Sequence, residues 1–368
     1  MASAAQASQD GSARAVALTA EAERLRAVGD HRRAAAAARR AVALFEKHEG
    51  RRHPDVAAAL LELGQALEMG DRWAVALRCY QRASDFLEDY ARLREPDIRR
   101  LRVKAWRALC VVERVLGQYA ISDRHGRRAA DRAERWFGAR DLDLAGALND
   151  IGMLRKYQGR YSEAPRFYRR ALRILAANGL ATSGDAASIY HNLGGIEHAR
   201  GRYARAEAPA RRAVVLRTRA FGLRHHLVAA DVAALAAIVE GRNRLGEAAR
   251  LYERAIADFR RAFGPRSYEV GVNLAGLAGV RQAQRRRQIA ETLYRRSLAI
   301  HLRLLGPRHL DVAITRNNLA LLLRERGRVS EARSEARRAF AAFRALLGPR
   351  HPTTRASERS LAQFARDR

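Results

Sequence analysis

Large, small and polar residues recur along this chain at fixed distances from a series of turn residues, which we call marks. The marks are 42 residues apart along most of the chain and 46 apart at one step, and they are Gly29, Asp71, Gly117, Gly159, Gly201, Asn243, Arg285 and Gly327. A small residue stands seven positions before every mark, and small residues stand five and twelve positions after it. Such regular spacing predicts a repeat protein.

Each repeat combines a large apolar residue beside a small one, then a turn, then two small residues seven positions apart. In the clearest copy these are Leu319 and Ala320 before Gly327, with Ala332 and Ala339 after it. Small residues seven apart share one face of a helix, and small side chains let two helices approach closely. The pattern therefore predicts two antiparallel helices in every repeat.

The same spacing predicts the domain organisation. Residues 1–12 consist largely of Ala, Ser, Gln and Gly, and we expect a disordered tail. A polar helix in 348–368 is expected to cap the last repeat. The 46-residue step predicts a longer helix or loop near Tyr90, and the glycines of the seventh repeat are expected to admit close neighbours. The eight repeats are expected at 13–50, 51–94, 95–138, 139–180, 181–222, 223–264, 265–306 and 307–347.

The stretch Gly306–Leu347 carries a family resemblance in its phrases LGPRHLDVA, RNNLALLL and GRxxEA. These resemble the long tetratricopeptide repeats found in kinesin light chains and in many bacterial proteins. The resemblance extends from about Ala13 to Arg368. It implies an all-α, right-handed superhelix in which the first helix of each repeat lines a concave groove.

Composition adds a strong positive charge to this picture. The formal net charge is +31, and of the 70 basic residues only Lys47, Lys104 and Lys156 are lysine. The choice of arginine indicates a GC-rich genome, whereas the shortage of acids favours an acidic partner. Cys110 occupies a small-residue position and is expected in the core, and with Cys79 it makes no disulfide framework. Without a long apolar run or signal peptide, we expect a cytoplasmic protein that does not enter a membrane.

The sequence offers no constellation for catalysis. It contains no phosphate loop, HExxH, CxxC or nucleophile elbow, so we expect neither an enzyme nor a cofactor. His191 and His198 share a helical face that could hold a metal, but surface histidines are the favoured interpretation and no metal is expected. His53, His309 and His351 recur at one position between repeats, which indicates a structural role.

The resemblance also implies which residues line the groove. They stand nine and ten positions before the mark, with others three, six and thirteen before it. Asn can hold a peptide backbone, and Arg and Lys can pair with carboxylates, so the resemblance implies an acidic peptide or protein segment as partner. Asn192 and Asn318 stand nine positions before their marks. Asp150 replaces Asn at this position in the fourth repeat and weakens the inference there. The expected groove residues are Lys104, Arg107, Arg114, Asn149, Lys156, Tyr157, His191, Asn192, His198, Asn317, Asn318 and Arg324.

Arginine pairs on the second helices suggest an alternative. They would form a ladder along the outer face that could contact nucleic-acid phosphates without reading sequence, although a solvated face is favoured. A further alternative is a partner role with a separate signalling NTPase. The pairs are Arg39 and Arg40, Arg127 and Arg128, Arg169 and Arg170, Arg211 and Arg212, Arg295 and Arg296, and Arg337 and Arg338.

Overall fold

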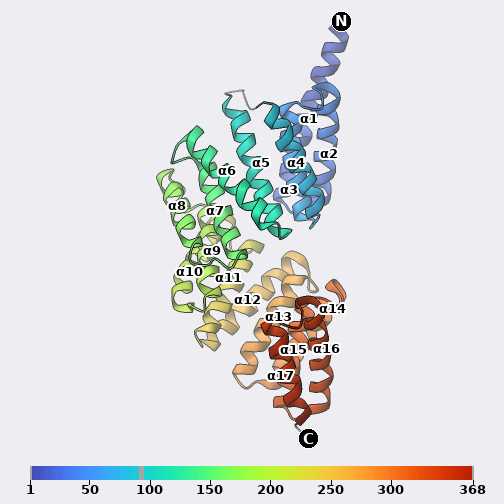
Figure 1. The fold of residues 1–368 in the computed structure, drawn as a ribbon, viewed down its shortest axis with the longest axis vertical. Helices are drawn as coiled ribbons and strands as arrows, with labels where there is room; N and C mark the ends of the chain where they lie inside the picture. Colours follow the sequence, from blue (N-terminus) through green and yellow to red (C-terminus); the bar gives the residue numbers. More distant parts are fainter. Residues whose placement is uncertain (1, 91–94, 367–368) are drawn as a thin grey trace. The chain divides into compact units, whose positions relative to one another are not determined.

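A computed structural model describes residues 2–90 and 95–366, with side chains described for 9–90 and 95–364. All regular secondary structure in these residues is α-helical, as predicted. The chain divides into two compact units, Met1–Ala181 and Thr182–Arg368. Within each unit, antiparallel helix pairs stack side by side (Figure 1).

The N-terminal unit contains four helix pairs. Its helices are α1 (Ala2–Ala27), α2 (His31–His48), α3 (Pro54–Met69), α4 (Trp73–Asp89), α5 (Pro96–Val115), α6 (Tyr119–Phe137), α7 (Leu142–Tyr157) and α8 (Ala164–Ala177). The loop or longer helix expected near Tyr90 falls largely on residues 91–94, which lie outside the described residues.

The C-terminal unit contains four further pairs and a final helix. Its helices are α9 (Gly184–Ala199), α10 (Tyr203–Phe221), α11 (His226–Gly241), α12 (Leu245–Phe263), α13 (Tyr268–Ala283), α14 (Arg287–Leu305), α15 (Leu310–Glu325), α16 (Val329–Leu347) and α17 (Pro352–Arg366). Apart from α1, each described helix falls within one expected segment. None of the described helices has the length and apolar character needed to cross a membrane.

The first helix begins earlier than expected. Residues 2–12, expected as a disordered tail, belong to α1 in the structure. Two features account for the difference. The His48 ring lies directly against Gly11, where a Cβ would meet it at 2.3 Å, and the Ser12 hydroxyl donates to the Glu49 carboxylate. The alanine-rich segment also has high intrinsic helix propensity.

The marks reverse the chain through a left-handed backbone conformation. At Gly327 the φ angle is +74°, and the next amide, that of Arg328, donates to the Leu323 carbonyl at 2.9 Å. This bond closes the helix end and needs a residue that tolerates positive φ. Three marks are not glycine, and Asp71, Asn243 and Arg285 are held at φ of 56°, 59° and 60°.

Histidines recur at the starts of first helices because their rings cap them. In His53, His309 and His351, Nδ1 accepts a hydrogen bond from the backbone amide two residues later, at 3.2–3.3 Å. His225 makes the same contact at 3.3 Å. The structural role predicted for the recurring histidines is confirmed.

Close helix contacts occur at the small residues. The Tyr80 ring lies against Gly64 and the Tyr168 ring against Gly152, so that a Cβ at either glycine would come within 2.5 Å of the ring. Cys110 is fully buried, as predicted. In the seventh repeat a Cβ at Gly271 would come within 2.7 Å of the His301 ring and one at Gly276 within 2.7 Å of the Tyr252 ring, so these two glycines admit close neighbours as expected, whereas Gly279 has only ordinary contacts at 3.5 Å.

The last helix covers the end of the C-terminal unit. Phe364 of α17 is buried in the cluster that includes Leu323 and Ala336. Arg333 donates to the Phe364 carbonyl, and the Thr354 hydroxyl donates to the Phe343 carbonyl at 3.3 Å. A terminal helix of this kind shields apolar surface that a further repeat would otherwise cover.

Buried carboxylates join consecutive repeats. Glu207 on α10 accepts hydrogen bonds from Arg211 on the same helix at 2.8 Å, from Arg244 of the next repeat at 2.8 Å, and from Arg242. Burial alone would raise the pKa of Glu207, but the hydrogen bonds from these arginines outweigh it and lower the pKa to about 2. The ionised form is therefore the one that the fold stabilises.

We expect Glu207→Gln to lower the free energy of unfolding of the C-terminal unit by about 3 kcal/mol at pH 7. The pKa of the folded state lies below the ordinary carboxyl value, so this contribution is complete above about pH 4.5 and disappears as the pH falls toward 2. Urea unfolding at several pH values measures it. Glu253→Gln is the control, because its ion pair with Arg281 is half exposed and worth less than about 1 kcal/mol. Equal losses of unfolding free energy in both variants would contradict the assignment of this stabilisation to the Glu207 network.

Arg285→Gly is expected to raise the free energy of unfolding by about 1 kcal/mol, because glycine accepts φ of 60° without the steric cost borne by a residue with a Cβ. The reverse change, Gly327→Ala, should lower it by a similar amount. Urea denaturation of both variants tests the pair. A destabilised Arg285→Gly protein would show that the arginine side chain matters more than the backbone.

Candidate functional site

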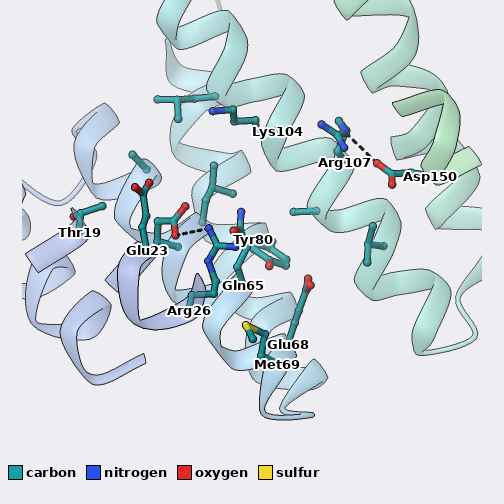
Figure 2. A pocket seen from close by; sticks show the side chains of 16 residues that line it. Thr19, Glu23, Arg26, Gln65, Glu68, Met69, Tyr80, Lys104, Arg107 and Asp150 are labelled. Carbon is teal, nitrogen blue, oxygen red and sulfur yellow. Dashed lines mark hydrogen bonds and ion pairs between the residues drawn. The ribbon is translucent and has the colours of Figure 1, made fainter. Parts of the chain in front are cut away.

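A cleft of about 650 Å³ opens on the first helices of the N-terminal unit (Figure 2). Tyr80 of α4 and Asp150 of α7 contribute to its lining. The offsets of three, six, nine, ten and thirteen residues before a mark account for most of its wall. The lining residues at these offsets on α1 are Thr19, Glu23 and Arg26. On α3 they are Ala58, Leu61, Glu62, Gln65 and Glu68, and on α5 they are Lys104, Arg107, Ala108 and Val111.

The charge of this cleft differs from the expectation. Apart from Tyr157, the residues expected in the groove carry amide, cationic or imidazole side chains, but Glu23, Glu62 and Glu68 bring carboxylates into the wall. Those residues were missed because the offsets were not applied to the first two repeats, where they identify all three. The groove of the N-terminal unit is therefore of mixed charge.

Two of the cleft's arginines are already paired. Arg107 donates to Asp150 at 3.0 Å and lies 3.5 Å from Asp143. Arg26 lies 3.4 Å from Glu62. Figure 2 shows Arg107 beside Asp150, with Lys104 in the upper part of the view and Glu68 in the lower part. Position along the first helices explains the separation, because Lys104 stands thirteen residues before its mark and Glu68 only three.

The other expected residues of this unit lie on α5 and α7. Arg114 and Lys156 occupy the last turns of these neighbouring helices. Arg114 is 8% exposed, and its guanidinium stands 4.7 Å from the centroid of the half-exposed Tyr157 ring. Burial lowers the pKa of Lys156, and the charge of Arg114 lowers it further. Asn149 is partly buried on α7. The structure thus brings the six expected residues of this unit onto two adjacent helices.

The expected residues of the fifth repeat make contacts of their own within the C-terminal unit. His191 Nδ1 lies 2.7 Å from a carboxylate oxygen of the buried Asp231, which also accepts from Arg217 at 2.7 Å. The His198 ring meets the Tyr203 ring edge-on, with centroids 5.5 Å apart. Asn192 is partly buried beside them on α9. His191 and His198 therefore face different partners.

The remaining expected residues lie on α15 near the end of the chain. Asn317 and Asn318 are partly buried, and the Arg324 guanidinium stands 5.2 Å from the centroid of the Phe364 ring of the final helix. Helices α11 and α13 separate them from α9, so the expected residues of the C-terminal unit form two groups. Within the described part of the chain, no three His, Cys, Asp or Glu residues are grouped in a way that could hold a metal ion.

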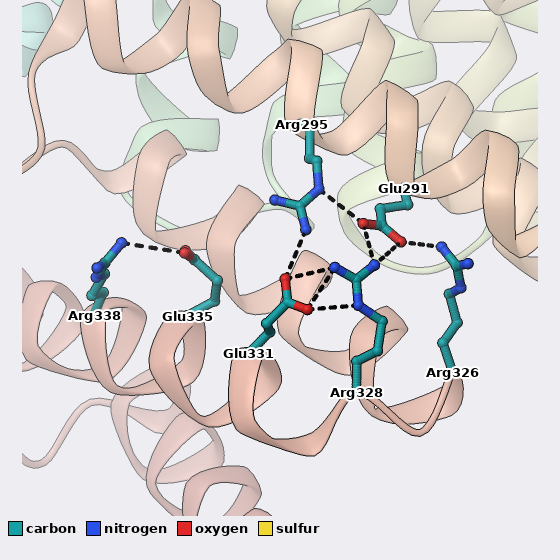
Figure 3. A network of polar contacts seen from close by, with 7 residues as sticks. All are labelled: Glu291, Arg295, Arg326, Arg328, Glu331, Glu335 and Arg338. Carbon is teal, nitrogen blue, oxygen red and sulfur yellow. Dashed lines mark hydrogen bonds and ion pairs between the residues drawn. The ribbon is translucent and has the colours of Figure 1, made fainter.

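In the described residues, four arginines of the outer ladder pair with a carboxylate of a neighbouring repeat: Arg128, Arg170, Arg211 and Arg295. In Figure 3, Glu291 accepts hydrogen bonds from Arg295 at 2.9 Å and from Arg328 at 2.7 Å, and it also pairs with Arg326. This network repeats the one around Glu207, two repeats earlier. Six of the twelve ladder arginines form ion pairs in the described residues: Arg127, Arg128, Arg170, Arg211, Arg295 and Arg338. These contacts compensate much of the charge that would otherwise face a nucleic acid.

Comparison with solved structures shows several proteins of similar fold. BtubC (BKLC) from P. vanneervenii is 24% identical over 62% of this chain and 91% of its own, with a TM-score of 0.56. The Rap conjugation gene regulator of the plasmid pLS20, solved with the Phr* peptide, is 17% identical over 88% of this chain and 78% of its own, with a TM-score of 0.58. A STAND protein with a tetratricopeptide repeat sensor from Pyrococcus horikoshii is 12% identical over 90% of this chain and 49% of its own, with a TM-score of 0.62.

No curated protein sequence matches the chain. A family model described as tetratricopeptide repeat matches residues 101–177, 185–261 and 270–345, which together make up more than half of the chain. Each matched segment spans two consecutive helix pairs of the structure. The chain belongs to the tetratricopeptide repeat family.

Proposed function

We propose that this protein is a non-catalytic interaction scaffold and that the concave face of its N-terminal unit binds an extended acidic segment of a partner protein. The supporting observation is the pair of cations at Arg114 and Lys156. In the described residues neither forms an ion pair with a carboxylate, although Arg114 is buried and Lys156 is partly buried. Two neighbouring cations without a counter-ion destabilise each other, and an incoming carboxylate would relieve this repulsion.

Unused hydrogen-bond donors lie beside these cations. Arg114 Nε and the hydroxyl of the fully buried Tyr168 have no hydrogen-bond partner among the described residues. The charge of Arg114 acts on the pKa of Tyr168, which places the two groups near each other. These two atoms are buried, so a carboxylate of a bound segment would instead accept charge-assisted hydrogen bonds from the accessible ends of the Arg114 and Lys156 side chains.

The positive net charge of the chain also favours an acidic partner. A formal charge of +31 attracts acidic segments over long distances and speeds their association at low salt. Both cysteines, Cys79 and Cys110, are free and buried, and we propose a cytoplasmic location, where thiols stay reduced. A protein of the same fold, the pLS20 Rap regulator, was solved with a peptide.

Lys156→Ala is expected to weaken the binding of acidic peptides about tenfold, because it removes one charge-assisted contact. The probe is an array of ten-residue peptides that contain zero to four Asp or Glu residues, followed by fluorescence anisotropy with the strongest binder at 50 and 300 mM NaCl. Wild-type affinity should rise with the number of acids.

Arg169→Ala is the matched control for this experiment. It removes one positive charge from the exposed outer face of the same repeat. If both variants lose affinity equally, binding reflects overall charge and the groove is not the site. If the wild-type protein retains no acidic peptide at 50 mM NaCl, the proposed function is wrong.

A further inference from the structure

Glu68 is a carboxylate in the cleft without a counter-ion. It lies in the last turn of α3 and lines the cleft together with Met69 and Tyr80. No Arg, Lys or His of the described residues forms an ion pair with it, and Arg26 and Arg107, which also line the cleft, pair with other carboxylates. Arg26 pairs with Glu62 and Arg107 pairs with Asp150.

The hydroxyl of Tyr80 lies beside this carboxyl group. Tyr80 is fully buried, and its hydroxyl makes no hydrogen bond of normal geometry in the described residues, but it is close enough to Glu68 to lower the pKa of that carboxyl group. The carboxylate of Glu68 thus provides acceptor atoms at one end of a cleft that is large enough for a side chain.

Burial raises the pKa of Glu68 to about 7, the nearby charge of Asp150 adds to this effect, and the Tyr80 hydroxyl, Arg114 and Arg26 act against it. The carboxyl group therefore exchanges its proton near neutral pH. A cation placed beside it would favour the ionised form and release that proton. The charged and titratable groups that face the cleft around Glu68 are Glu23 and Arg26 from α1, Glu62 from α3, Tyr80 from α4, Lys104, Arg107 and Arg114 from α5, and Asp150 from α7.

We propose that Glu68, next to the buried Tyr80, forms a subsite for a lysine or arginine side chain of the bound segment. The inference rests on the proposed function, because it assigns part of the same groove. Met69 and Val111 offer apolar surface for the aliphatic stem, while the Glu68 carboxylate receives the charged end. The partner is therefore a segment with both acidic and basic residues, placed opposite different repeats.

The repeat geometry sets the spacing between these residues. Glu68, Arg114 and Lys156 occupy the same position, three residues before the mark, in the second, third and fourth repeats. Packed helices lie about 10 Å apart, and an extended peptide advances about 3.3 Å per residue. The basic residue of the ligand should accordingly stand about three residues from its nearest acidic residue.

An equivalent pair in the other unit shows what a purely structural arrangement looks like. Glu240 and Tyr252 occupy the positions of Glu68 and Tyr80 in the sixth repeat, and there the Tyr252 hydroxyl donates to Glu240 at 3.0 Å. The carboxylate and the hydroxyl of that pair therefore satisfy each other's hydrogen bonding. Glu240→Gln is therefore a matched control for Glu68→Gln.

The test uses the full chain and two fluorescein-labelled peptides that differ at one position. Both carry an Asp-Glu pair, and the residue three positions away is either Lys or Gln, placed on each side of the pair in turn. At pH 8 the wild-type protein should bind the Lys peptide at least fivefold more tightly, and the preference should shrink toward pH 6 as Glu68 takes up its proton. Long-range attraction to a positive protein would favour the Gln peptide instead, so overall charge cannot produce this result.

Glu68→Gln should abolish the Lys preference and its pH dependence while the acidic peptides still bind, and Glu240→Gln should preserve both. The Glu68→Gln protein should also melt at a higher temperature than wild type above pH 7, because it no longer buries a charged carboxylate, which shows that it is folded. Binding of both peptides without a Lys preference in wild type would overturn the subsite alone. A Lys preference that survives Glu68→Gln would also overturn the subsite alone. The absence of any peptide binding would overturn both the subsite and the proposed function.

Discussion

The close approach of the two helices in each repeat is the constraint on which the rest of the structure depends. At Gly64 and Gly152 a tyrosine ring of the second helix occupies the space where a Cβ would stand. Because the rings hold the paired helices at short range, the side chains three, six, nine, ten and thirteen residues before the mark lie on the opposite side of the first helix in the first three repeats. The lining of the cleft in the N-terminal unit follows from this contact.

Arginine serves two different purposes in this chain. On the outer face, Arg211 and Arg295 converge with arginines of the next repeat on the buried carboxylates Glu207 and Glu291, so that charge joins one repeat to the next. These networks are structural, because each carboxylate is surrounded by donors within hydrogen-bonding distance. In the groove, Arg114 has no such carboxylate among the described residues. The excess positive charge thus indicates a binding surface only where no carboxylate of the structure compensates it.

The groove of the N-terminal unit combines both signs of charge in separate places. Arg26 and Arg107 are paired with acids, which leaves Lys104, Arg114 and Lys156 as cationic positions and Glu68 as an acidic one. A partner segment that met all of these would need charges in a defined order. Such an arrangement favours specificity over simple attraction, because a uniformly acidic segment would place a carboxylate against Glu68 at an electrostatic cost.

The sequence by itself determined the repeat and the helix pairs, because periodic small residues and left-handed turns are local requirements that each repeat must satisfy. The family resemblance supplied the offsets that are expected to face the groove. The sequence also identified His53 and its equivalents as structural and Cys110 as buried. Applied to every repeat, the same offsets would have located Glu62 and Glu68 as well. Only the tertiary structure decided which charges remain uncompensated. The partner of Arg107 is 43 residues away at Asp150, and that of Arg211 is 36 residues away at Glu247, so their pairing depends on how successive repeats stack and not on any local pattern.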